Sequence, residues 1–175
     1  MIKLLDKNSY EKYPITFSYE TKAYYDVSMT TASNTIQITL TKKPFDRAVK
    51  KSFVDYLYEP YRERAEAYGY FRDETLVGII EIDFEAWSKR LRISECIVFE
   101  AFQRQGIATK LMQFASERGM ALGARALVLE TQSCNVNAID FYHSVGFELS
   151  GLDTLCYSNQ DIENREVRLE LGKKL

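Results

Sequence analysis

A predicted strand, a tight loop and the start of a helix follow one another in IVFEAFQRQGIA, residues 97–108. The loop carries the pattern Gln-x-x-Gly-x-Ala, from Gln103 to Ala108. The first turn of a helix leaves backbone N–H groups without partners, and the helix dipole adds positive potential there. Gly106 and Ala108 are small, so the phosphates of a ligand can approach this backbone closely. Taken alone, the stretch is equally well explained as a diphosphate site and as an ordinary loop that contains a glycine.

Three elements are predicted downstream of this loop. Apolar positions in Gly106–Leu122 recur every three to four residues, which predicts an amphipathic helix that ends at a glycine. Ala126–Thr131 reads ALVLET and predicts a short strand buried on both faces. The next motif is NVNAIDFYHSVGF, residues 135–147. Within it, Asn137–Ser144 is predicted to be a short helix with Asn137 as its cap.

A β-hairpin is predicted upstream of the loop. Ala65–Phe71 and Thr75–Phe84 alternate around a turn, and Arg90–Phe99 is predicted to be a third strand. Side chains alternate along a strand, so the acidic residues of the second strand share one face and its apolar residues share the other. The acids of the second strand are Glu81, Asp83 and Glu85, and the apolar residues are Ile80, Ile82 and Phe84.

The two ends of the chain are less clearly patterned. Pro14–Met29 and Thr35–Leu40 alternate, which predicts two strands. Lys43-Pro44 is expected to break the second one. Phe45–Tyr58 has apolar residues four positions apart and is predicted to be a helix that a proline ends. Two more strands are expected at Phe147–Leu149 and Glu166–Leu171. Strands mixed with helices in this order predict a mixed sheet with helices packed against it.

The composition is that of an ordinary globular chain. It has 175 residues, 46% apolar and 27% charged, which predicts a single domain over residues 1–175. The formal charge of −2 gives no basic excess for binding nucleic acid. The apolar runs are too short for a membrane span and the N-terminus is too polar for a signal peptide, so a cytoplasmic protein without a membrane partner is expected. Three cysteines and one histidine, His143, predict neither a disulfide framework nor a metal site.

Residues 97–108 and 135–147 together resemble the two signature segments of the GNAT superfamily of acetyl-CoA-dependent N-acetyltransferases. The order and types of element also agree, over about residues 65–150. The matching residues are Val98, Gln103, Gly106, Ala108, Asn135, Ala138, Phe141, Tyr142, Gly146 and Phe147. The resemblance implies an α/β (α+β) fold with a mixed, mostly antiparallel central sheet, splayed at the acetyl-CoA site, and helices on both faces. Residues 1–60 would complete the substrate side.

A narrower resemblance is to streptothricin acetyltransferases. It rests on LETQ at 129–132, LDTLCYSN at 152–159 and Trp87. It implies acetyl transfer to a primary amine of a small cationic molecule, streptothricin among the candidates, and hence antibiotic resistance. Acetylation of a polyamine, a protein N-terminus or a lysine stays open as an alternative, as does an acyl-CoA sensor without turnover.

The resemblance implies acetyl-CoA as co-substrate, with no metal. Backbone groups of Ile97, Val98 and Phe99 would hold pantetheine, and one of their N–H groups would stabilise the oxyanion. Asn135 and Tyr142 would lie at the pantetheine and the thioester. Amides of the loop and first helical turn would bind the diphosphate, from Gln103, Arg104, Gln105, Gly106, Ile107, Ala108 and Thr109. Arg104 is equally well explained as a solvated surface residue.

Two catalytic residues are implied. Tyr142 would protonate the leaving thiolate, or else pack in the core beside Phe141. Glu95 is the first choice for the base that deprotonates the amine. Substrate contacts are predicted from Glu81, Asp83, Trp87 and Glu95. Each acid is equally well explained as a solvated charge, but clustered carboxylates would attract a cation.

Three further expectations complete the sequence analysis. His143 is expected at the surface without a catalytic role. Cys134 is expected to be a small packing residue, because the family transfers the acetyl group directly to the amine. Members of the family often dimerise, so a homodimer is considered, with a small-molecule amine as the other partner.

Overall fold

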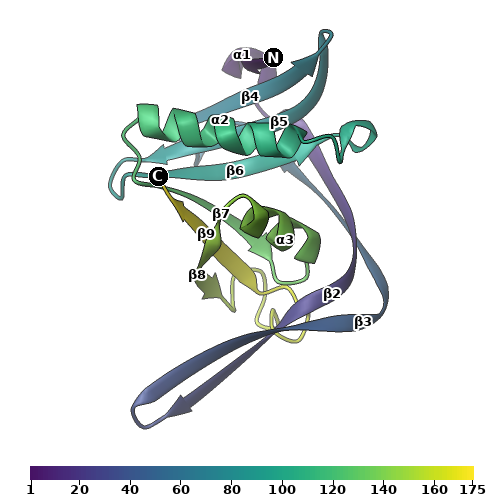
Figure 1. Cartoon of the computed structure of the whole chain (residues 1–175), viewed down its shortest axis with the longest axis vertical. Helices are drawn as coiled ribbons and strands as arrows, with labels where there is room; N and C mark the ends of the chain where they lie inside the picture. The colour runs from purple at the N-terminus through teal and green to yellow at the C-terminus, as the bar shows by residue number, and fades with distance from the viewer. The chain divides into compact units, whose positions relative to one another are not determined.

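The computed structural model describes all residues, 1–175, and divides into two compact units (Figure 1). Unit 1 comprises Met1–Phe17, Phe53–Leu129 and Gly172–Leu175. Unit 2 comprises Ser18–Ser52 and Glu130–Leu171. None of the helices has both the length and the hydrophobicity needed to cross a bilayer.

Unit 1 is built on a sheet whose neighbouring strands are β1, β4, β5, β6 and the start of β7. Their pairing is antiparallel, except that β6 and β7 run parallel. The predicted hairpin and third strand are confirmed as β4, β5 and β6. The strands are β1 (Ile2–Leu4), β4 (Ala65–Arg72), β5 (Thr75–Glu85), β6 (Arg90–Val98) and β7 (Ala126–Gln132).

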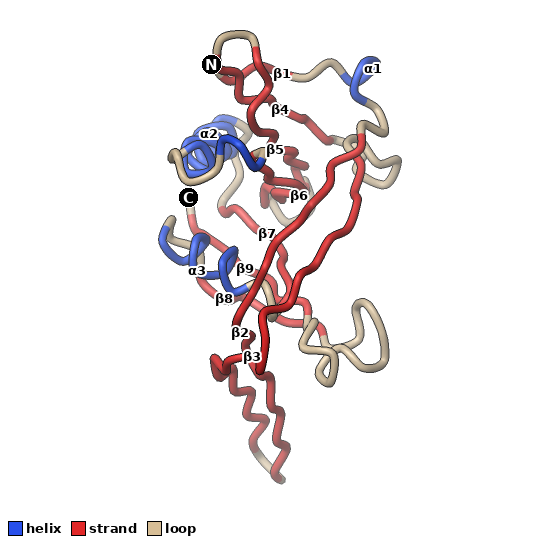
Figure 2. The backbone as a smooth tube through the Cα atoms, turned by 90° about the vertical axis from the view of Figure 1, so that its right-hand side faces the viewer, coloured by secondary structure: helices blue, strands red, loops and turns tan.

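One face of this sheet is covered by α2 (Ile107–Ala121), which lies along β5 and β6 in both ribbon views (Figures 1 and 2). Its buried residues include Ile107, Leu111 and Ala115, the apolar stripe that predicted the helix. A short 3-10 helix, η1 (Glu100–Phe102), connects β6 to this helix. The side chains of Ile80 and Ile82 are buried, as the alternation along β5 predicts.

The opposite face packs on a second apolar layer in unit 1. Leu5, Ile15, Leu57 and Tyr58 are buried there against Ile79. The hydroxyl of Tyr58 donates to the carbonyl of Leu5 at 2.5 Å. This layer includes two elements that the sequence analysis did not predict, β1 and the one-turn helix α1 (Lys7–Tyr10).

Pairing between β6 and β7 is confined to three residues of each strand, from Arg90–Ala126 to Arg92–Val128. Beyond Arg92, β6 continues to Val98 without a partner in β7. The register of β5 against β6 also shifts between Glu81 and Ile82, as at a β-bulge. The expected splay therefore starts three residues into β6.

Unit 2 holds most of a long hairpin, with β2 (Pro14–Ala32) paired to β3 (Thr35–Tyr56). In its other part β9 lies between the end of β7 and β8. A small core forms where Val27 and Ile139 pack with residues of the last strand. The remaining elements are α3 (Val136–Ser144), β8 (Glu148–Asp153) and β9 (Arg168–Lys174).

The predicted helix over Phe45–Tyr58 is wrong, because Phe45–Tyr56 belong to β3 and the next two residues form a turn. Its apolar residues are spaced four apart, and that spacing fits one face of a strand as well as one face of a helix. Lys43-Pro44 does not end the strand either. A proline removes one backbone donor, and a two-stranded sheet tolerates the loss because both strands are edges.

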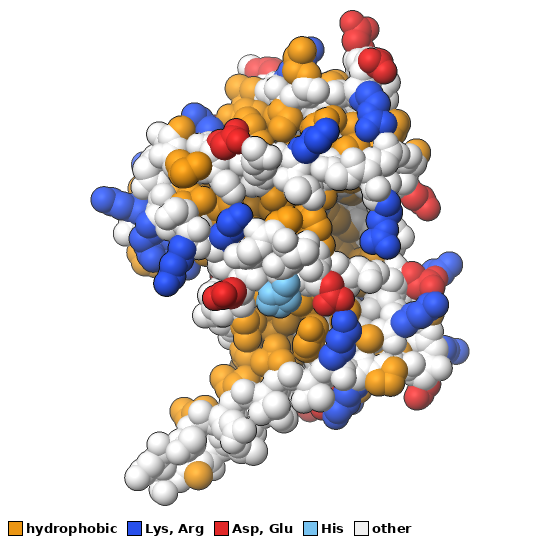
Figure 3. Space-filling model, in the orientation of Figure 1, with side chains coloured by type: hydrophobic (Ala, Val, Ile, Leu, Met, Phe, Trp, Pro, Cys, Tyr) orange, Lys and Arg blue, Asp and Glu red, His pale blue; other side chains and the backbone are white.

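The far end of the β2–β3 hairpin is uncharged. Residues 28–41 contain no acidic or basic side chain, and Figure 3 shows this end without red or blue atoms. Exposed apolar side chains there include Ile36, which is 70% exposed, and Ile38. This end of the ribbon therefore lacks the charged residues that usually protect edge strands.

Candidate active site

The loop that opens α2 has the geometry of an anion site. Gly106 is the N-cap residue, with φ 75°, and no side chain caps the helix. A Cβ added at Gly106 would meet nothing within 4 Å, so the space above this backbone is open. The first N–H groups of a helix have no partner inside it, and the dipole favours negative charge there. These residues therefore fit a diphosphate.

The polar side chains of this loop hold the loop itself. The amide of Gln103 donates to the carbonyl of Val98 at 3.1 Å. Gln105 accepts from Arg72 at 2.7 Å, and the Arg72 guanidinium also lies over the ring of Phe102. The side chains of Gln103 and Gln105 are thus structural, which leaves diphosphate contact to their backbone. The sequence analysis did not predict that Arg72 supports this loop, because Arg72 lies 33 residues before Gln105 in the chain.

The exposure of the other loop residues shows which of them can offer a side chain to the diphosphate. Arg104 is exposed and has φ 61°, a left-handed conformation that bends the loop just before Gly106. Thr109 is exposed on the first turn, whereas Ile107 is buried and Ala108 half-buried. Ile107 can therefore contribute only its backbone.

The end of β6 narrows the choice of oxyanion donor. The N–H of Phe99 donates to the carbonyl of Val77 at 3.0 Å, so it is already used toward β5. Backbone N–H groups alternate in direction along an antiparallel strand, which turns Ile97 the same way and Val98 the opposite way. Of the three residues predicted to hold pantetheine, Val98 presents its N–H on the side of β6 away from β5.

An ion cluster lies on the acidic face of β5 and β6. Glu81 and Glu95 stand directly opposite each other in the strand register, which alone would be repulsive. Arg62 bridges them, with Nη1 at 2.5 Å from Glu81 and Nη2 at 2.7 Å from Glu95. The other oxygen of Glu81 accepts from the backbone N–H of Tyr58 at 2.5 Å. Glu81 is fully buried and has both oxygens occupied, so a substrate contact from Glu81 is not supported.

Glu95 differs from Glu81 in its surroundings. It is 4% exposed, and its Oε1 has the ion pair with Arg62 but no hydrogen bond. Burial and the neighbouring charge of Asp55 raise the pKa of Glu95 to about 8, against the effect of Arg62. A base of this strength suits the removal of a proton from an amine near neutral pH.

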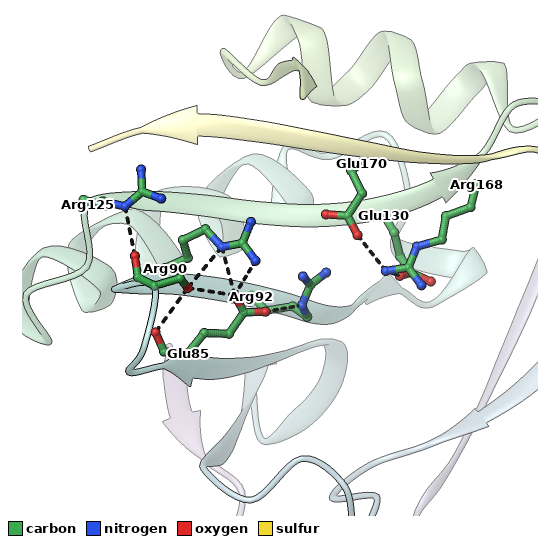
Figure 4. A network of polar contacts seen from close by, with 8 residues as sticks. Glu85, Arg90, Arg92, Arg125, Glu130, Arg168 and Glu170 are labelled. Carbon is green, nitrogen blue, oxygen red and sulfur yellow. Dashed lines mark hydrogen bonds and ion pairs between the residues drawn. The ribbon is translucent and has the colours of Figure 1, made fainter. Parts of the chain in front are cut away.

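The rest of the acidic face is largely neutralised by arginines. Glu85 lies between Arg90 and Arg92, each with a nitrogen 2.7 Å from a carboxylate oxygen (Figure 4). Burial would raise the pKa of Glu85, but these arginines outweigh it and lower that pKa. Asp83 is half-buried and stands opposite Arg92 in the register; burial raises its pKa. The predicted carboxylates thus lie on a mixed face in which arginines accompany them.

Trp87 is not part of this cluster. It is 85% exposed in the β5–β6 turn, where the guanidinium of Arg90 lies 5.7 Å from its ring centre. It lies six positions after Glu81, beyond the end of β5 at Glu85. The structure therefore does not bring Trp87 to Glu95 as a substrate contact.

In unit 2, the N-cap of α3 lies two positions earlier in the chain than predicted. Asn135, not Asn137, is the N-cap, and its side chain accepts from the N–H of Ala138 at 3.3 Å. Asn137 instead donates to the carbonyl of Glu20 at 3.1 Å. Because the cap uses Oδ1 of Asn135, a contact with pantetheine would have to come from its side-chain Nδ2 or its backbone.

Tyr142 lies on α3, half-buried, with its ring 5.5 Å from that of Phe141 and 6.0 Å from that of Phe147. His143 is exposed and its Nδ1 contacts the carbonyl of Phe147 at 2.9 Å, as expected of a surface residue. Cys134 is buried beside the hydroxyl of Tyr19, and burial raises the pKa of its thiol. A raised pKa keeps the thiol protonated and unreactive.

A second ion network in unit 2 is also drawn in Figure 4. Arg168 of β9 pairs with Glu130 and with Glu170, the latter at 2.6 Å. Its other nitrogen contacts the sulfur of Cys156 at 3.6 Å. These contacts join the end of β7 to β9 and leave Cys156 in a structural setting.

We expect Arg62→Met to lower the free energy of unfolding by about 3 kcal/mol at pH 8, because it leaves two buried carboxylates without their cation. The loss should be smaller at pH 5. Without Arg62 the pKa values of Glu81 and Glu95 rise further, and a raised pKa gives stability at low pH that is lost as pH rises through it. Urea unfolding at the two pH values measures this. Arg64→Met, at an exposed position two residues away, is the matched control; equal losses in both variants would contradict the bridge.

The comparisons with known proteins agree with this geometry. The model of the acetyltransferase (GNAT) family matches residues 35–147. The chain belongs to the GNAT family. A streptothricin acetyltransferase of Escherichia coli is 30% identical over 124 residues, which cover 70% of this chain and 71% of that protein. Streptothricin acetyltransferase A of Bacillus subtilis is 28% identical over 67% of this chain and 66% of its own length.

Two solved structures share the fold over nearly the whole chain. Nourseothricin acetyltransferase aligns with a TM-score of 0.77 at 23% identity, covering 99% of this chain and 97% of its own. A Bacillus anthracis protein described as a candidate streptothricin acetyltransferase, in complex with acetyl coenzyme A, aligns at 0.76 and 20% identity, covering 100% and 97%. The fold class and GNAT membership predicted from the sequence are confirmed, and the protein is an acetyl-CoA-dependent N-acetyltransferase.

Proposed function

We propose that this GNAT enzyme acetylates a primary amine of a small cationic molecule, with streptothricin as the leading substrate. The observation that carries the proposal is the match to the Escherichia coli streptothricin acetyltransferase over 70% of the chain. Antibiotic inactivation in the cytoplasm, where acetyl-CoA is made, is the corresponding role.

The charge of the acidic face supports a cationic substrate. Five carboxyl groups on or beside β5 and β6 lie near four arginines, a surplus of one carboxyl group. The acids are Asp55, Glu81, Asp83, Glu85 and Glu95, and the arginines are Arg62, Arg64, Arg90 and Arg92. Such a surplus attracts a cation, and because solvent ions screen it, the substrate KM should rise with salt.

In the proposed reaction the chain contributes four functions. The backbone of Gly106 and the first turn of α2 binds the diphosphate of acetyl-CoA. The N–H of Val98 donates to the thioester oxygen as negative charge develops there. Glu95 takes a proton from the substrate ammonium so that its nitrogen can attack, and the phenol of Tyr142 gives a proton to the leaving thiolate.

We expect kcat/KM to rise with pH and to level off above about 8. Glu95 must be ionised to accept a proton, and burial together with Asp55 raises its pKa to about 8. An ammonium with a pKa near 10.4 costs roughly 4–5 kcal/mol to deprotonate at pH 7, so the protein base matters most there. Initial rates at saturating acetyl-CoA between pH 6 and pH 9 measure the profile. A flat profile would argue against Glu95 as the base.

The decisive experiment measures release of the CoA thiol from acetyl-CoA across a panel of amines. The panel holds streptothricin, a polyamine, a peptide with a free N-terminus and a peptide with an internal lysine. Turnover with streptothricin at the highest kcat/KM supports the proposal. A preference for one of the other amines replaces the substrate class, and binding of acetyl-CoA without turnover on any amine would favour an acyl-CoA sensor.

A further inference from the structure

The environment of Glu95 is crowded with carboxyl groups. Its Oε1 is buried and forms an ion pair with Nη2 of Arg62 at 2.7 Å, without the geometry of a hydrogen bond. Asp55, near the end of β3, and Glu95 both approach Nη2 of Arg62, so their carboxyl groups lie close together. Burial and the neighbouring charge of Asp55 raise the pKa of Glu95. Two carboxyl groups that share one site do not readily both ionise, and a single proton held between them removes the repulsion.

The single positive charge of Arg62 cannot balance the carboxyl groups around it. Nη2 of Arg62 lies 2.7 Å from Glu95 and 3.7 Å from Asp55, so both carboxyl groups approach the same nitrogen. The other arm of the guanidinium is committed to Glu81. One positive charge thus faces three carboxyl groups, and a single proton on the Asp55–Glu95 pair brings the cluster closer to balance.

The other groups around the cluster add no positive charge. The thiol of Cys96, next to Glu95 on β6, has its pKa raised by burial and stays neutral. The hydroxyl of Tyr61 accepts from Arg62 at 3.3 Å, and its ring faces the same guanidinium. Neither group can take the place of a proton on the carboxyl pair.

Asp55 forms the solvent side of the pair. Its side chain is 35% exposed, whereas that of Glu95 is 4% exposed. Its Oδ1 accepts from the backbone N–H of Tyr56 at 2.7 Å, which fixes the carboxyl group in place. Of the two carboxyl groups, Asp55 is therefore the one through which a proton held by the pair can exchange with water.

We propose that Asp55 and Glu95 share one proton in the resting enzyme, and that Asp55 is a positioning residue that sets the pH at which Glu95 accepts the proton of the amine. When Glu95 takes a proton from the ammonium, the shared proton leaves from Asp55 to water. One N–H bond of the substrate breaks, one O–H bond forms on Glu95, and one proton is released. The proposal rests on the proposed function, because it takes Glu95 as the base.

The test begins without any substrate. Carbon-13 NMR of the side-chain carboxyl groups follows the titration of Glu95 in the full-length protein, with Glu95→Gln used to assign its signal. We expect a midpoint near 8 in the parent, as burial and Asp55 predict from the raised pKa of Glu95. Asp55→Asn removes the like charge and should lower the midpoint below about 7. Asp73→Asn, in the β4–β5 turn, removes an equal charge far from the pair and should leave it unchanged.

The second readout is the pH profile of kcat/KM with the best amine of the panel. In Asp55→Asn its acid limb should move to lower pH by about one pH unit, in step with the NMR midpoint. A purely structural loss would lower the rate equally at every pH. Asparagine retains the oxygen that accepts from Tyr56, and Asp55→Ser serves as a second uncharged variant if Asp55→Asn does not fold.

The outcomes separate the two proposals. An unchanged Glu95 midpoint in Asp55→Asn overturns the shared proton, whatever the enzyme acetylates. A shifted midpoint without turnover on any amine supports the shared proton and overturns the proposed function. A shifted midpoint with an unshifted acid limb, in an enzyme that does acetylate an amine, overturns the role of Asp55 in the reaction.

Discussion

Tyr142→Phe is expected to lower kcat by about 10²- to 10⁴-fold, the usual contribution of a positioned proton donor. The substitution removes only the phenolic oxygen. The ring can keep its contacts with Phe141 and Phe147 on α3, so the fold should be unaffected. The affinity for acetyl-CoA should stay nearly unchanged, because the donor acts on the leaving thiolate and the diphosphate binds at another element. Single-turnover kinetics and calorimetry measure the two quantities.

The matched control is Tyr24→Phe in the same unit. The ring of Tyr24 packs on that of Phe45 at 4.6 Å and against the guanidinium of Arg165. Tyr24→Phe therefore measures how much kcat changes when a hydroxyl is removed from another packed tyrosine ring. We expect little change in kcat for Tyr24→Phe. If Tyr142→Phe also loses less than about threefold, Tyr142 is a packing residue and the thiolate receives its proton from another source.

The loop before α2 could be predicted because local chemistry determines it. A left-handed residue at Gly106, an uncapped helix and small side chains are all encoded within a few residues of the sequence. The hairpin of β4 and β5 was equally readable from strict alternation around a turn. Where neighbouring residues decide the backbone, the sequence suffices for the prediction.

The β3 strand shows where a local pattern becomes ambiguous. Phe45, Val49 and Phe53 are four residues apart, and both a helix and a strand place such residues on one side. What decides between the two is pairing with β2, which lies earlier in the chain. The same limit applies on a smaller scale to Asn135 and Asn137, two good capping residues separated by one position.

The ion cluster around Glu95 could not be predicted for a different reason. Glu95 is predicted to be the base from its position on the predicted strand. Its controlling partners Asp55 and Arg62 come from 40 and 33 residues earlier in the sequence. No local pattern marks an arginine that will be buried between two carboxylates. Only the fold brings these groups together, and it pairs Glu81 and Glu95 with Arg62.

Gly106→Glu is expected to abolish measurable binding of acetyl-CoA. The Cβ position at Gly106 is open, so the new side chain fits but occupies the space in front of the first turn of α2. Its carboxylate would stand beside the phosphates. Two like charges about 4 Å apart repel by about 4 kcal/mol at an effective dielectric constant of 20. That energy corresponds to about a thousandfold weaker binding, measured by calorimetry.

The same helix provides the control. Gly123 ends α2 with φ 76° and also has nothing within 4 Å of an added Cβ. Gly123→Glu therefore imposes the same left-handed strain and adds the same charge at the opposite end of the helix. We expect Gly123→Glu to lower the melting temperature at least as much as Gly106→Glu, because the helix dipole disfavours negative charge at the C-terminal end, while keeping the parent affinity for acetyl-CoA. If both variants bind acetyl-CoA as tightly as the parent, the diphosphate does not lie at the N-terminus of α2, because a carboxylate at Gly106 would have no phosphate to repel.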